Sequence, residues 1–171
     1  LTFLVGSIFA GVSMIAPAMI NASGAPDPDT TAQSKVSALR EGAKFVKGHP
    51  ILPGLYLLDV GVTIVSFYRM LFPLFASGLY GMGAEGTALL GSANALGGVG
   101  GSMLVFFTEK IRHKGRIVLT ATLAYAIGLI AFGLTPIFWI GLIIVAFLGA
   151  TDSVGMTMRQ AIVQLTTPDR L

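Results

Sequence analysis

Residues 117–148, which read IVLTATLAYAIGLIAFGLTPIFWIGLIIVAFL, contain no charged side chain and one turn-like break, at Thr135-Pro136. A transmembrane helix needs about 20 consecutive apolar residues, so this stretch predicts two spanning helices joined by a short turn. The whole chain has the same character, because 54% of its 171 residues are hydrophobic and 11% are charged, whereas soluble domains carry about 25% charged residues. The sequence therefore predicts an all-α, polytopic transmembrane helix bundle.

Five apolar stretches fill most of the chain and predict about five spanning helices. They cover roughly residues 1–20, 50–80, 86–107, 117–134 and 137–165. The second is longer than one crossing needs, which indicates a tilt or a kink at Pro73. Thr135 and Pro136 are expected to form the N-cap and first turn of the last helix. The first stretch lacks the flanks of a signal peptide, and the chain is interpreted as a fragment of a longer polytopic protein.

A basic amphipathic helix is predicted between the first two spans, at Gln33–Lys47. Apolar residues recur at helical spacing on one face: Val36, Leu39, Ala43 and Val46. Charged residues lie mostly off that face: Lys35, Arg40, Glu41, Lys44 and Lys47. This pattern is typical of a helix on a membrane surface, and a solvated linker helix is the alternative. Gly48 is expected to end it and Pro50 to open the next helix.

The loop charges predict the topology. The breaks at 21–49 and 108–116 each contain four Lys or Arg, and the breaks at 81–85 and 135–136 contain none. Because positive residues are retained on the cytoplasmic side, both basic loops are expected to be cytoplasmic, and Leu1 is expected to start on the outer side. Basic loops beside apolar spans favour anionic lipid as a partner over nucleic acid.

Four ionisable residues lie inside predicted spans: Asp59, Arg69, Asp152 and Arg159. A charge at the bilayer centre costs at least about 2.5–3.5 kcal/mol, so such residues face a protein interior or a water-filled cavity. Thr63 and Ser66 share one helix face with Asp59 and Arg69, while Asp152 and Arg159 share a face of the last span. These residues predict a polar pathway in which carboxylates carry protons and arginines bind anionic substrate. The alternative is that Asp and Arg pair to hold helices together, with Arg159 the nearest candidate partner of Asp59 by depth, because both lie in the cytoplasmic half of their helices.

The third span is rich in small residues. Gly97 and Gly101 form a small-xxx-small pair, and Gly98 lies beside them, which predicts close packing against another helix. Asn94 on the same span is expected either to contact substrate or to bond a neighbouring helix.

Other motifs in the chain indicate neither an enzyme nor a cofactor. The segment GMGAEG at 81–86 matches GxGxxG, but it joins two apolar helices instead of following a strand. His49 and His113 have no partner at ligand spacing, so no metal site is expected. The chain has no cysteine, which excludes disulfides and thiol chemistry.

The segment EGAKFVKGHP at 41–50, followed by Leu57-Leu58-Asp59, resembles the major facilitator superfamily, in particular its enterobactin-exporter-like efflux branch. The resemblance continues through Arg69 and Phe72-Pro73, and through the glycine-rich next helix. It ends with Arg159, Gln164 and Thr167-Pro168-Asp169, and so covers nearly the entire chain.

The resemblance implies a place for each segment. Residues 1–20 would be the last helix of the N-terminal half, helix six of twelve. Residues 21–49 would be the central cytoplasmic loop with its amphipathic helix, and residues 50–171 the first four helices of the C-terminal half. The superfamily's cytoplasmic gating-loop motif is matched, with a different spacing, only by Glu109, Lys110, Gly115 and Arg116.

The function that the resemblance implies is part of a secondary active transporter, a proton-coupled exporter or antiporter of a siderophore or drug-like molecule across the bacterial cytoplasmic membrane. Such proteins bind substrate near the bilayer midplane between two halves. The expected partners are the substrate, protons, the lipid bilayer and the remaining half of the transporter. The expected substrate or coupling pathway contains Asp59, Thr63, Ser66, Arg69, Asn94, Asp152 and Arg159. The alternative is a non-transporting membrane scaffold or assembly protein that binds partner helices.

Overall fold

The computed structural model describes residues 7–8, 10–11, 13, 35–108 and 114–167, and every element in these ranges is helical. Four of the described helices are long and apolar enough to cross a membrane: Leu52–Leu79, Gly83–Phe107, Lys114–Leu134 and Phe138–Thr166. The prediction of an all-α integral membrane bundle is therefore confirmed. The first predicted span, 1–20, lies almost wholly outside the described residues.

The chain divides into two units, with the boundary after Arg40. Helix α2, Lys35–Gly48, runs across this boundary and has the helical form that its periodicity predicts. Val36 and Leu39 on its apolar face are 74% and 77% exposed, so this face is open for contact with another surface.

The larger unit begins its spanning helices with α3, Leu52–Ser66. The proline in the first turn of α3 is Pro53, so the prediction that Pro50 opens this helix is wrong. His49 instead lies at the N-terminus of α3. Its Nδ1 accepts hydrogen bonds from the backbone N–H of Ile51 at 3.3 Å and of Leu52 at 3.4 Å. A side-chain acceptor at this place satisfies helix N–H groups that have no partner within the helix.

The same span continues beyond α3 in an irregular form. The 3₁₀ segment η2, Phe67–Leu71, is followed by one turn of α-helix, α4 at Phe72–Leu74, and by the π-helical segment η3, Phe75–Leu79. Pro73 has no N–H to donate to the carbonyl of Arg69, and that carbonyl accepts the N–H of Phe72 instead. The predicted irregularity around Pro73 therefore takes the form of a 3₁₀ segment before it and a π segment after it.

The remaining spans are α5 at Gly83–Thr108, α6 at Lys114–Leu134 and α7 at Phe138–Thr166. Helix α6 begins three residues earlier than predicted. The N-cap of α7 is the extended residue Ile137, which makes no side-chain cap bond. The prediction that Thr135 caps this helix and that Pro136 lies in its first turn is therefore wrong.

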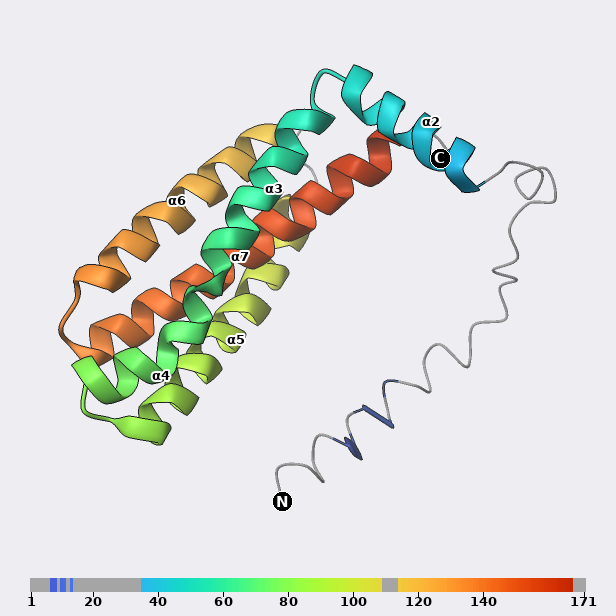
Figure 1. Ribbon diagram of the computed structural model, residues 1–171. Helices are drawn as coiled ribbons and strands as arrows, with labels where there is room; N and C mark the ends of the chain where they lie inside the picture. The colour runs from blue at the N-terminus through green and yellow to red at the C-terminus, as the bar shows by residue number, and fades with distance from the viewer. Residues whose placement is uncertain (1–6, 9, 12, 14–34, 109–113, 168–171) are drawn as a thin grey trace. The chain divides into compact units, whose positions relative to one another are not determined.

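The turn between η3 and α5, at residues 80–82, and the turn between α6 and α7, at residues 135–137, lie at the same end of the bundle (Figure 1). They are joined there by the hydroxyl of Tyr80, which donates to the carbonyl of Thr135 at 3.1 Å. The turn before α5 needs glycine, because Gly81 and Gly83 have φ of +66° and +54°.

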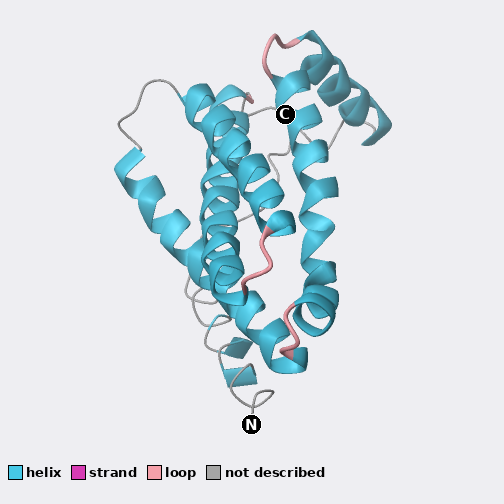
Figure 2. Ribbon diagram, turned by 90° about the vertical axis from the view of Figure 1, so that its left-hand side faces the viewer, coloured by secondary structure: helices cyan, strands magenta, loops and turns pink. Residues whose placement is uncertain are grey.

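Helix α7 packs against both α5 and α6, and in Figure 2 the described connections between long helices are short loops. The core they share contains aromatic and aliphatic side chains from all four spans, among them Phe72, Leu90, Tyr125, Val145 and Leu148. The second span contributes unevenly to this core. Phe72 and Ala76 near its far end are buried, whereas Leu52 is the one buried residue of α3.

The contact between α5 and α7 depends on glycine. A Cβ placed on Gly97 would overlap the backbone of Ala146, and a Cβ on Gly101 would overlap the backbone of Ala150. Gly149 faces the backbone of Asn94 in the same way. The two helices therefore approach to backbone contact.

Candidate functional site

Two ion pairs join the second span to α7. Arg69 Nη2 lies 2.5 Å from Asp152 Oδ2, and Arg159 Nε lies 2.9 Å from Asp59 Oδ1. Each pair contains one residue from each span. The four ionisable residues identified in the sequence therefore form two ion pairs at different depths along the helices. This arrangement neutralises four charges within segments that would otherwise place them in hydrocarbon.

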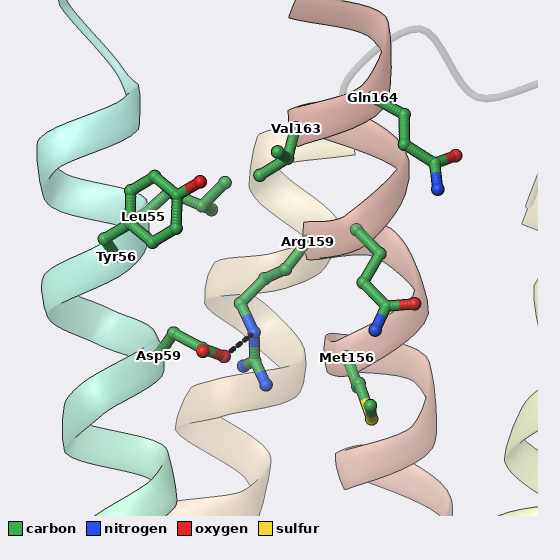
Figure 3. A pocket seen from close by; sticks show the side chains of 8 residues that line it. Leu55, Tyr56, Asp59, Met156, Arg159, Val163 and Gln164 are labelled. Carbon is green, nitrogen blue, oxygen red and sulfur yellow. Dashed lines mark ion pairs between the residues drawn. The ribbon is translucent and has the colours of Figure 1, made fainter. Parts of the chain in front are cut away.

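Figure 3 shows the ion pair of Asp59 and Arg159 between α3 and α7. The two side chains of this pair differ in burial. The side chain of Arg159 is 9% exposed, whereas that of Asp59 is 53% exposed. Although the two atoms are close, the N–H at Nε makes no aligned hydrogen bond. The contact is therefore a charge pair whose cation is buried and whose anion remains accessible.

An open pocket of about 490 Å³ lies beside this pair, between α3 and α7. Its lining combines charged, amide, aromatic and apolar side chains: Leu55, Tyr56, Asp59, Met156, Arg159, Gln160, Val163 and Gln164. Figure 3 shows the carboxylate of Asp59 directed from α3 towards the guanidinium of Arg159, with Met156 and Gln164 on the α7 side. This volume lies in the range of small-molecule sites, about 300–1,000 Å³.

The second ion pair lies at the level of the aromatic core. Arg69 donates to Asp152, and the side chains are 43% and 21% exposed. One turn away, the hydroxyls of Ser66 and Tyr125 lie 3.0 Å apart and form a hydrogen bond between the second span and α6. Ser66 therefore contacts α6, while Thr63 on the same helix is exposed.

Asn94 lies at the contact between helices. Its Nδ2 donates to the hydroxyl of Tyr68 at 3.1 Å and to the carbonyl of Val145 at 3.4 Å. Of the two alternatives for this residue, the structure has the bond to neighbouring helices. Asn94 and Gly97 thus lie on the face of α5 that approaches α7.

The predicted gating loop is described only in part. Gly115 and Arg116 lie in the first turn of α6, while Glu109 and Lys110 lie outside the described residues. A gating role for this segment stays a prediction.

Several residues of the pocket were not predicted from the sequence. Tyr56 precedes Asp59 by one helical turn, and Gln160 follows Arg159 directly. Residues three or four positions from an intramembrane charge share its helix face, and this spacing could have identified them. However, Tyr56 and Met156 also suit a helix face that points to lipid. Their role depends on where α3 and α7 separate, which only the tertiary structure shows.

Proteins of known function resemble this chain along almost its whole length. The enterobactin exporter EntS of Escherichia coli O1:K1 / APEC is 25% identical over 169 residues, which cover 97% of this chain and 40% of the exporter. The proteins of the same name from Escherichia coli O139:H28 (strain E24377A / ETEC) and Shigella boydii serotype 18 match to the same extent. This chain is similar to bacterial enterobactin exporters.

The predicted resemblance to the enterobactin-exporter-like branch of the major facilitator superfamily is thereby confirmed. The chain spans about 40% of the length of these exporters. No family model matches the chain, and no solved structure does.

Proposed function

We propose that this chain forms most of one half of a secondary active exporter in the bacterial cytoplasmic membrane, where it moves a small molecule in exchange for protons. The observation that carries the proposal is the pair of Asp59 and Arg159 beside an open pocket between two apolar helices. A carboxylate that is accessible from a pocket within a membrane can bind either a proton or a ligand. The named relatives are exporters, which supports the same conclusion.

The segments take the places that the resemblance implies. Residues 1–20 end the N-terminal half, residues 21–49 form the central loop, and residues 50–171 begin the C-terminal half. In this proposal, the N-terminal half closes the open side of the pocket, because transporters of this type bind substrate between their halves. Both basic loops lie on the cytoplasmic side, and the pathway includes Asp59, Arg69, Asp152 and Arg159.

A scaffold function is the weaker alternative, and a catalytic function is weaker still. The scaffold interpretation rests on the glycine-rich span, whose small face was expected to bind partner helices. Gly97 and Gly101 are instead in contact with α7 of the same chain. The glycine face of α5 is therefore already occupied by α7.

Proton exchange can be tested with the full-length protein that contains this chain. In inverted membrane vesicles that maintain a pH gradient, a pH-sensitive dye reports protons that leave when a substrate is taken up. We expect proton release on addition of enterobactin or of ethidium, and loss of release in Asp59→Asn. If vesicles accumulate a substrate with no accompanying proton movement, the exchange mechanism is wrong; if they accumulate neither substrate, the export function is wrong.

A further inference from the structure

We propose that one water molecule binds in a small cavity between α3, α6 and α7 and joins the two ion pairs into a single hydrogen-bonded network. The cavity has a volume of about 10 Å³, and one water needs about 10–15 Å³. Its lining comes from three helices of this chain, so the site does not depend on the remaining half of the transporter. The inference is also independent of the proposed transport function.

The lining of this cavity is polar, which distinguishes it from cavities that stay dry. Five polar side chains border it: Asp152, Thr151 and Arg159 on α7, and Thr122 and Tyr125 on α6. Dry cavities in proteins are lined by apolar groups, whereas a buried water has two to four polar partners. The side chains at this cavity therefore suit a water.

Arg159 reaches the cavity through its guanidinium group. The residue is 7% exposed, and its Nε N–H has no aligned acceptor although Asp59 is close. Figure 3 shows the side chain extending from its own turn of α7 towards the level of Met156. A Cβ placed on Gly155 would lie 3.5 Å from Arg159 Nη1, so the guanidinium lies over the turn of α7 that leads back to Asp152. A water at this place accepts a guanidinium N–H and lowers the cost of burying the charge.

The donors and acceptors at the cavity select water over an ion. Arg159 can only donate hydrogen bonds, and an ionised Asp152 can only accept them. Thr122 and Thr151 donate their hydroxyl protons to carbonyls one turn earlier in their own helices, at 2.8 Å and 3.0 Å, which leaves both oxygens as acceptors. A metal cation would be repelled by the guanidinium, and an anion by the carboxylate. Water accepts from Arg159 and donates to Asp152 and to a threonine oxygen, so it satisfies both kinds of group.

The water connects the two depths at which charges lie in the bundle. Arg159 is paired with Asp59 on α3, and Asp152 accepts a hydrogen bond from Arg69 on the same span. With a water between Arg159 and Asp152, the contacts run without interruption from Asp59 to Arg69. The four charges then form one network instead of two separate pairs.

The direct test is a structure of the full-length protein at a resolution that shows buried waters. We expect a water peak within about 3.2 Å of a guanidinium nitrogen of Arg159 and of a carboxylate oxygen of Asp152, and we expect Gly155→Ala to remove it. In this variant the new Cβ lies 3.5 Å from Arg159 Nη1 and 4.0 Å from Ala121 Cβ. These are ordinary contacts between groups that line the cavity, so the methyl group fits but takes the place of the water.

The melting temperature provides a second measurement, because the sign of its change depends on the water. In a dry cavity Gly155→Ala would fill space and favour the helix, which would raise the melting temperature. Since the methyl group displaces a water that is bonded to two charged groups, we expect a fall of about 2–4 °C. Gly155→Ser supplies a hydroxyl in place of the water and should melt above Gly155→Ala, although serine has the lower helix propensity. Gly100→Ala, which meets nothing within 4 Å, is the control and should not lower the melting temperature.

The proposal is overturned if no peak appears while other buried waters are resolved, or if the peak persists in Gly155→Ala. A Gly155→Ala protein that melts above the parent, or a Gly155→Ser protein that melts below Gly155→Ala, would also contradict it. If the Gly155 variants do not fold, the presence or absence of the peak in the parent structure decides the question.

Discussion

At the scale of the residue, the central feature is a buried cation that depends on a half-exposed anion. Arg159 lies among the buried residues of α7, and Asp59 is 2.9 Å from its Nε. Replacing Asp59 with Asn leaves this guanidinium without a counter-ion. Because Asp59 is half exposed, we expect a loss of about 1–2 kcal/mol of folding free energy, less than for a fully buried pair. Thermal unfolding of the purified full-length protein measures this loss.

A second substitution distinguishes the ion pair from other effects of the same change. In Asp59→Asn/Arg159→Gln neither charge remains, so the melting temperature should return towards that of the parent protein. Glu85→Gln should stay within about 0.5 kcal/mol of the parent. If the double variant is less stable than Asp59→Asn alone, Arg159 stabilises the bundle through contacts other than this pair.

At the scale of the element, the contact between α5 and α7 requires small residues at particular positions. A Cβ at Gly97 or Gly101 would meet backbone atoms of α7, which cannot move aside as a flexible side chain can. Gly97→Ala and Gly101→Ala are each expected to destabilise the protein by about 1–3 kcal/mol. Gly100→Ala on the same helix meets nothing within 4 Å and is the control, with helix propensity favouring it slightly. Equal melting temperatures for the three variants would show that α5 and α7 are further apart.

Helix α2 is expected to bind the surface of an anionic membrane. Its exposed Val36 and Leu39 form one face, and each basic residue near an anionic surface contributes about 1 kcal/mol. A peptide of residues 33–48 should bind anionic vesicles, and replacement of Arg40, Lys44 and Lys47 with Gln should weaken binding, more so at low salt. Glu41→Gln, which removes a negative charge instead, should strengthen it. Equal binding by all three peptides would favour a solvated linker.

At the scale of the whole molecule, sidedness is the prediction that connects the pocket to transport. The pocket lies at the ends of α3 and α7 that lead to the basic loop 21–49 and to residue 167, so the predicted topology puts it in the cytoplasmic half of the membrane. Single cysteines at Ser37 and Arg116 should react with a membrane-impermeant maleimide only after the cells are opened. A cysteine at Glu85 should react in intact cells. The reverse labelling pattern would invert the topology and the direction from which the pocket fills.

The sequence by itself determined the class of the fold and identified the ionisable residues that lie within the spanning helices. Long uncharged stretches such as 117–148 form helices in a bilayer. In a helix every backbone hydrogen bond is made within the segment itself, so no polar group is left exposed to hydrocarbon. The same reasoning identifies Asp59, Arg69, Asp152 and Arg159, since each charge stands out against an apolar background. The four-residue spacing of Gly97 and Gly101 likewise identifies them in the sequence as a close-packing pair. Local capping was predicted less well, as Thr135 and Pro50 show, because several residues near a turn can fill the same role.

Depth along the spans already made Arg159 the nearest candidate partner of Asp59, and the structure has this pair. Only the tertiary structure decided that Arg69 meets Asp152 and which of the charges a ligand can reach. Helical periodicity places Asp59 and Arg69 on one face of the second span. Which residue of α7 each of them contacts depends on how the two helices are positioned lengthwise against each other. The sequence treats Asp59 and Arg159 alike as intramembrane charges, yet one is half exposed and the other is buried. That difference arises because α3 packs loosely where α5, α6 and α7 pack tightly, and burial is a property of the assembled helices. Sequence periodicity describes one helix at a time, so the pocket and its accessible carboxylate appear only when the helices are placed together.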